Sequence, residues 1–162
     1  MSYDIYIGAG RPEFDIEDCY LYARWVVNSE AHDDAQKFPN DSMTGNGNSR
    51  HPSYSGWSDF CRESGLYDLF LNKEFGLMAS HPGCKIIQES HVAEVKKALV
   101  DWERKATKPP GFSGFGKFNK ETQEWETQDE GKYDHILARL IWLDWWMTWA
   151  LENCEVPAIQ NT

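Results

Sequence analysis

The sequence predicts a single α+β domain over residues 1–162, with a small antiparallel sheet, three or so helices, and a C-terminal helix that is largely buried. Three observations predict this class. The chain has 162 residues, 41% of them hydrophobic and eight of them Trp, which suffices for one core without disulfides. A short run of alternating β-forming residues opens the chain, and two long stretches of helical periodicity fill its second half. No repeat or linker divides it.

The first element is a strand over Tyr3–Ile7, where β-forming residues alternate before a glycine- and proline-rich stop. Residues 19–27 allow two interpretations. Their aromatic and β-branched side chains favour a strand that pairs with the first one, and we prefer this interpretation. The spacing of Ile16, Cys19 and Tyr20 also permits a helix.

Residues 28–57 form the longest segment without helical or strand periodicity, and they are rich in Asn, Asp, Gly and Pro. A structureless stretch of this length inside a compact domain is uncommon and is often a functional loop. We therefore look for function here first.

Short helical elements follow this loop. Ser58 or a neighbour can cap a helix that runs to about Ser64, where Gly65 suits a left-handed terminal position. Leu66–Phe70 adds a second apolar turn, and His81–Gly83 reads as a turn around a proline.

The clearest amphipathic helix begins at a Ser90 cap and ends before Pro109. Residues 111–116 form a glycine- and phenylalanine-rich loop, and 117–126 resembles a hairpin with a polar tip. The last helix, about 133–154, is apolar nearly all round, which is typical of a helix packed on several sides. Its Arg139 and Asp144 therefore need partners.

Charge excludes some classes of partner. The chain has 26 acidic and 16 basic residues, a net charge of −10, which argues against a general binder of duplex nucleic acid. Residues 1–41 carry 9 acids and 3 bases, 42–118 carry 8 and 10, and 119–162 carry 9 and 3. The middle segment alone suits an anionic ligand.

Location follows from what the sequence lacks. It has no apolar run fit to span a membrane and no signal-like start, so we expect a soluble, cytoplasmic protein without membrane contact. The four cysteines are far apart and form no Cys-x-x-Cys pair, which predicts reduced thiols.

The long loop contains the side chains that a small, heterocyclic, anionic ligand needs. Amides and hydroxyls can read base or sugar edges, a guanidinium can grip a phosphate, and aromatic faces can stack on a base. The other interpretation is an ordinary surface loop, with its aromatic residues inserted into the core. The candidate ligand-binding residues are Asn40, Thr44, Asn46, Asn48, Ser49, Arg50, His51, Tyr54, Trp57 and His81.

Metal and cofactor chemistry are weakly supported. The pair His81-x-x-Cys84, with His91 nearby, does not supply the four ligands of a structural zinc site, so we expect no metal and no cofactor. The glycines of 111–117 do not have the spacing of a phosphate-binding loop.

Catalytic signatures are weak as well. Cys61, Asp59 and His51 supply the parts of a nucleophilic site, but no strained-turn signature accompanies them. We therefore assign no catalytic residue, and whether the protein is an enzyme stays open.

Several strings resemble a group of small uncharacterised proteins of bacteriophages and their bacterial hosts. The resemblance rests on Phe38–Asp41, Met43–Gly45, Asn48–Pro52, Tyr54–Trp57, Gly65-Leu66, Gly76–Met78, His81–Cys84 and the closing Leu140–Pro157 segment. It covers most of the chain and implies no activity or catalytic residue. It implies a context, because small acidic phage proteins often interfere with host defence inside the bacterial cytoplasm.

We thus expect a phage-type counter-defence protein that sequesters a small anionic nucleotide-like signalling molecule. The alternative is an inhibitor that binds a host defence protein directly, through acidic residues such as 121–130 and exposed aromatic side chains. A nucleotide-cleaving enzyme that uses Arg50, His51 and His81 is a third hypothesis. A homo-oligomer is compatible with all three.

Overall fold

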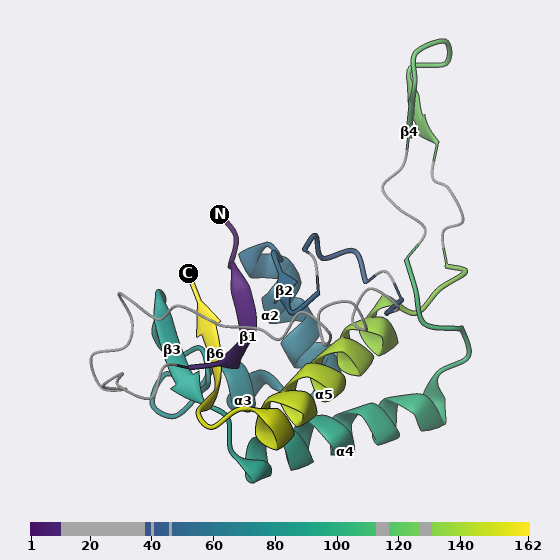
Figure 1. Ribbon diagram of the computed structural model, residues 1–162. Helices are drawn as coiled ribbons and strands as arrows, with labels where there is room; N and C mark the ends of the chain where they lie inside the picture. Colours follow the sequence, from purple (N-terminus) through teal and green to yellow (C-terminus); the bar gives the residue numbers. More distant parts are fainter. Residues whose placement is uncertain (11–37, 40, 46, 113–116, 127–130) are drawn as a thin grey trace.

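The computed structural model describes residues 1–10, 38–39, 41–45, 47–112, 117–126 and 131–162 (Figure 1). The strand expected over 19–27 lies outside these residues. The fold is α+β, as predicted. Its elements in chain order are β1 (Ile5–Ala9), β2 (Ser49–Arg50), α2 (Tyr54–Ser64), α3 (Tyr67–Leu71), β3 (Gly83–Ile86), α4 (Glu89–Lys105), β4 (Lys117–Asn119), β5 (Glu124–Glu126), α5 (His135–Asn153) and β6 (Pro157–Asn161).

The main sheet has four antiparallel strands in the order β2-β1-β6-β3. The opening strand exists, although it begins two residues later than predicted. Its neighbours in the described sheet come from distant parts of the chain: Ile5 pairs with Arg50 on one side, and Ile7 pairs with Ile159 on the other. Strand β2 has only two residues, too few for a periodic signal in the sequence, and neither β3 nor β6 was predicted from it.

One face of the sheet packs against α5, and α4 runs beside α5 (Figure 1). Ile5, Ile7 and Ile159 are fully buried on this face, together with Trp142 and Trp146 of α5. The core therefore lies between the sheet and the helices, and aromatic side chains fill much of its volume.

Helix α2 begins earlier than the sequence predicts. It starts at Tyr54 rather than near Ser58, because the Ser53 hydroxyl accepts a hydrogen bond from the Gly56 amide at 3.1 Å and caps it. Gly65 ends it in the predicted left-handed conformation, with φ of 77°. The expected loop over 28–57 is thus replaced at its end by β2 and the first turn of α2.

The cap of α4 also differs from the expected one. The N-cap is Gln88 rather than Ser90, and the backbone amide of Gln88 donates to Nδ1 of His91 at 3.0 Å. The two residues form a reciprocal capping box, an arrangement in which histidine takes the place of the usual glutamate or glutamine.

Helix α5 is capped by Asp134, whose Oδ1 accepts from the Leu137 amide at 2.8 Å. Ten of its 19 residues are buried. Trp145, Thr148 and Trp149 are partly exposed, so the helix keeps a face toward solvent. Among the described residues, no helix has the length and apolar character that crossing a bilayer requires.

The predicted hairpin is present as strands β4 and β5, which among the described strands pair with each other alone. It projects away from the helices and the main sheet (Figure 1). Phe118 and Trp125 are directly opposite each other across it, with ring centroids 5.5 Å apart. Both are exposed, Phe118 by 42% and Trp125 by 68%.

Candidate functional site

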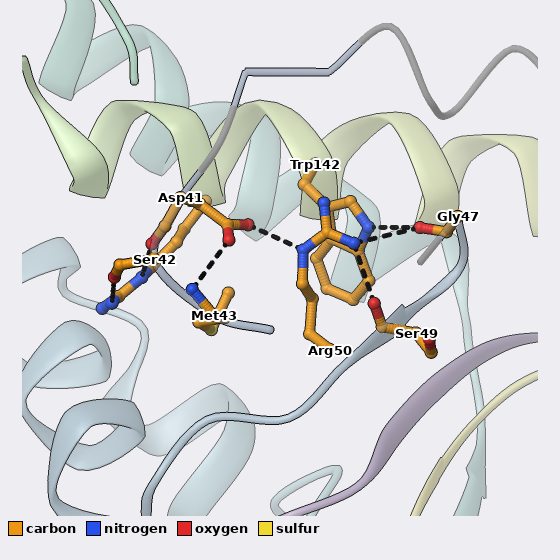
Figure 2. Close-up of polar contacts among 8 residues, drawn as sticks. Asp41, Ser42, Met43, Gly47, Ser49, Arg50 and Trp142 are labelled. Carbon is orange, nitrogen blue, oxygen red and sulfur yellow. Dashed lines mark hydrogen bonds and ion pairs between the residues drawn. The ribbon is translucent and has the colours of Figure 1, made fainter. Parts of the chain in front are cut away.

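Arg50, the expected phosphate ligand, is buried in the core and held by protein groups. Its Nε donates to Oδ2 of Asp41 at 2.9 Å, and Nη1 donates to the carbonyls of Gly47 and Ser49. The guanidinium carbon lies 4.8 Å from the centroid of the Trp142 ring. Figure 2 shows Asp41 on one side of the guanidinium and the Gly47 carbonyl on the other. This arrangement gives Arg50 a structural role.

Asp41 also connects this loop to α5. Its Oδ1 accepts from the Met43 amide at 3.0 Å, and its backbone carbonyl accepts from Nε of Arg139 at 3.1 Å. Nη2 of Arg139 donates to the Ser42 hydroxyl at 2.7 Å. Arg139 thus has its expected partners, and burial lowers its pKa from the ordinary value.

Other predicted ligand residues complete this structural loop. Asn48 is buried, and its Nδ2 donates to the Ile7 carbonyl at 2.8 Å. Ser49 lies in β2 and is also buried. Thr44 is exposed, and its carbonyl accepts from the His51 amide at 2.6 Å. Trp57 is fully buried, as the alternative interpretation of the loop expects.

The remaining two loop candidates, Asn40 and Asn46, lie outside the described residues.

His51 does not act together with Arg50. Its Nδ1 is 2.7 Å from Oδ1 of Asp4, and its ring meets Tyr6 edge-on at 6.2 Å. Tyr6 follows the core residue Ile5 in β1, so the two side chains point to opposite faces of the sheet. His51 packs on Tyr6, whereas Arg50 pairs with Ile5 and is buried, so His51 and Arg50 lie on opposite faces. A single ligand phosphate cannot lie between them in this conformation.

The fold brings two of the predicted site residues, Tyr54 and His81, into side-chain contact. The Tyr54 hydroxyl is 2.6 Å from Nε2 of His81. Nδ1 of the same imidazole is 2.8 Å from Oδ1 of Asn161, and the Tyr3 ring packs on both aromatic groups. These four residues form what we call the Tyr54 cluster.

A cavity of about 390 Å³ lies between the end of α4 and the start of α5. We call it the α4–α5 pocket. Its size falls within the range of small-molecule sites, roughly 300–1,000 Å³. Its lining residues are Glu63, Trp102, Lys105, Ala106, Thr107, Lys108, Tyr133, Asp134, His135 and Ile136.

The charged groups of this pocket differ in whether they already have protein partners. The Asp134 carboxylate is engaged, because Oδ2 accepts from Nε1 of Trp102 at 2.8 Å and Oδ1 caps α5. Nζ of Lys105 lies 4.3 Å from the centroid of the Trp102 ring, which places a cation and an aromatic face on one wall. Burial, followed by repulsion from Arg139, lowers the pKa of His135 and so favours the neutral imidazole.

From the sequence we did not predict the residues that line the α4–α5 pocket, nor Asn161 of the Tyr54 cluster. The middle of the chain has the only favourable charge for an anion, and this signal does include Lys105 and Lys108. Asn161 gave no signal, because it lies 80 residues from His81 and meets it only through the pairing of β3 with β6.

The described part of the chain contains no group of three or more His, Cys, Asp or Glu side chains that could hold a metal ion. Cys61, Cys84 and Cys154 form no disulfide. Cys61 is fully enclosed, and burial raises the pKa of its thiol far above the ordinary value. It lies beneath the surface rather than beside His51.

No family model matches the chain, and neither a curated protein nor a solved structure matches it. The resemblance to phage proteins therefore stays a prediction.

Proposed function

We propose that this protein binds a small aromatic anion of the nucleotide class in the α4–α5 pocket. The observation that carries the proposal is the pocket itself, which combines a suitable volume with two lysines and two aromatic side chains. The expected ligand is kept, while its binding site moves from the loop around Arg50 to this pocket. The reason is that Arg50 already has protein partners.

Electrostatics supports an anion here. The chain has a net charge of −10, and Lys105 and Lys108 belong to the one segment in which bases outnumber acids. Asp134 is drawn into bonds with Trp102 and the helix, which reduces its effect on a ligand. Glu63 opposes an anion, so the affinity depends on both lysines together.

Aromatic walls support a planar group on the same ligand. Trp102 and Tyr133 line the pocket, and indole and phenol faces stack on nucleobases. The neutral imidazole of His135 can form a hydrogen bond to a base edge or a sugar hydroxyl. In the phage context implied by the resemblance, such binding would sequester a signalling nucleotide of the host.

Isothermal titration calorimetry tests this proposal with AMP, ADP, ATP, 3′,5′-cyclic AMP and ADP-ribose. Adenosine and inorganic phosphate serve as controls, since each offers only one part of the expected ligand. We expect at least one nucleotide to bind, and both controls to bind more weakly. Hydrogen exchange should slow in 102–108 and 133–136 on binding. If no nucleotide binds, or if protection appears elsewhere, the proposal is wrong.

A second candidate function is direct binding to another protein through the hairpin. The specific observation is that Trp125 and Phe118 form an exposed aromatic pair on a two-stranded arm. Isolated two-stranded hairpins are marginally stable in water, and exposed tryptophans are frequent binding hot spots. Glu121 and Glu124 near the tip favour a partner with a basic rim around an apolar pocket.

A further inference from the structure

The Tyr54 cluster forms a directed chain of hydrogen bonds. Nδ2 of Asn161 donates to the Ser80 carbonyl at 3.1 Å, which turns Oδ1 toward Nδ1 of His81. An amide oxygen only accepts, so Nδ1 must carry the proton. In the neutral imidazole Nε2 is then the acceptor, and it lies 2.6 Å from the hydroxyl of Tyr54.

Packing holds these groups in place. The Tyr3 ring lies 4.4 Å from the ring of Tyr54 and 4.9 Å, edge-on, from that of His81. Asn161 is fully buried, whereas His81 is exposed and Tyr54 is partly exposed. The buried Asn161 thus holds the His81 imidazole in place, while the Tyr54 hydroxyl remains accessible to solvent.

We infer that Tyr54 is a nucleophile that His81 activates as general base, with Asn161 as the positioning residue. A nucleophile hydrogen-bonded to a base, which is itself oriented by a third group, is the arrangement of hydrolytic triads. This activity is separate from the α4–α5 pocket, because the cluster lies at the start of α2 and the pocket includes Glu63 near the end of that helix.

The charges around the cluster indicate the substrate. In the described part of the chain, the polar partners of Tyr54, His81 and Asn161 include no lysine or arginine. The contacts of the cluster are all with neutral groups, so it offers no cation to pair with a phosphate, and we take a neutral carboxylic ester as the substrate class.

The step is an acyl transfer. Oη of Tyr54 attacks the ester carbonyl carbon while its proton passes to Nε2 of His81. The bond from this carbon to the leaving alcohol breaks, and the leaving oxygen takes the proton from His81. An acyl-tyrosine and an alcohol result, and water can later release the acid by the same route.

The test is acetylation by p-nitrophenyl acetate, located by tandem mass spectrometry on the intact folded chain. Tyr67 and Tyr133 are internal controls, because they are 39% and 36% exposed. We expect Tyr54 to be acetylated at least about tenfold faster than either control, since a general base contributes roughly 10²–10⁴-fold. Equal rates at the three tyrosines would overturn the inference.

His81→Ala tests the base directly. His81 is exposed, so this variant should fold, which its melting temperature verifies. We expect Tyr54 acetylation to fall to the rate of Tyr67 and to recover when free imidazole is added. Asn161→Asp retains an acceptor for Nδ1 and should keep the Tyr54 rate well above that of His81→Ala. An unchanged rate in His81→Ala, or a loss that imidazole does not restore, would contradict the role of His81.

Discussion

Asp41 and Arg50 form an ion pair inside the protein, with Oδ2 of Asp41 2.9 Å from Nε of Arg50 and side-chain exposures of 1% and 9%. The pair connects Asp41, in the polar segment 28–57, to Arg50 in β2. Through Arg139, which bonds to the Asp41 carbonyl, it also joins this segment to α5. A residue that suggests ligand binding in the sequence is thereby part of what holds the core together.

Removing one partner of this pair should destabilise the fold. Arg50→Ala leaves the Asp41 carboxylate buried and unpaired, which costs about 3–5 kcal/mol of unfolding free energy. Arg62→Ala is the matched control, because Arg62 and its partner Asp59 are 60% and 66% exposed. Its cost should stay below about 1 kcal/mol. Urea denaturation followed by circular dichroism measures both, and equal stabilities would contradict the structural role of Arg50.

Gly45 should tolerate no side chain. Its φ is 144°, and a Cβ there would lie 2.3 Å from the Ser49 carbonyl oxygen and 2.8 Å from Cα of Arg50. Gly45→Ala therefore combines backbone strain with overlap against backbone atoms, at a cost of about 3 kcal/mol. Gly65→Ala lies in the milder left-handed region, at φ of 77°, and a Cβ there has nothing within 4 Å, so about 1 kcal/mol is expected. If the two variants melt at the same temperature, β2 does not lie against this loop as described.

His91 should make stability depend on pH. Burial lowers its pKa below the ordinary 6.5, and a protonated Nδ1 could not accept from the Gln88 amide. As pH falls through about 6.5, the unfolded chain takes up a proton before the folded one does, so folding stability declines. His91→Gln keeps a capping acceptor that does not titrate. Its melting temperature should therefore fall less than that of the wild type between about pH 7.5 and about pH 5. Parallel curves would contradict the capping role.

Trp125 should matter for binding and little for folding. Its ring contacts Phe118 on an arm that pairs only with itself, so Trp125→Ser should change stability by less than about 0.5 kcal/mol. Trp146→Ser, at a fully buried position, should unfold the protein or cost about 3–5 kcal/mol. Thermal melts compare the two. A large loss for Trp125→Ser would mean that the hairpin packs on the body and is not free for a partner.

Local patterns were enough to predict the helices and the hairpin. The apolar stripe of α4, the apolar length of α5 and the polar tip of the hairpin are each contained in one short window. The sheet was harder, because β2 has two residues and β6 pairs with β1 from the opposite end of the chain. Helix starts shifted because Ser53 and Gln88 serve as caps, where several nearby polar residues were equally suitable.

The site was less predictable than the fold. Polar character led us to predict that residues 48–51 bind a ligand, but composition cannot distinguish a ligand-binding arginine from one paired to a buried aspartate nine residues away. The α4–α5 pocket joins residues about thirty positions apart, such as Trp102 and Asp134, and their contact depends on how the two helices pack. Tyr54 and His81 were identified individually, while Asn161 needed the sheet register.

The most direct test of the central claim compares nucleotide affinity in two double variants by calorimetry. Lys105→Ala/Lys108→Ala removes the cations of the pocket, and Lys96→Ala/Lys97→Ala removes two lysines of the same helix outside its lining. For the tightest-binding nucleotide, the first pair should lower affinity by about tenfold or more, and the second by less than about twofold. Equal losses, or none in the pocket variant, would show that the ligand is not bound between α4 and α5.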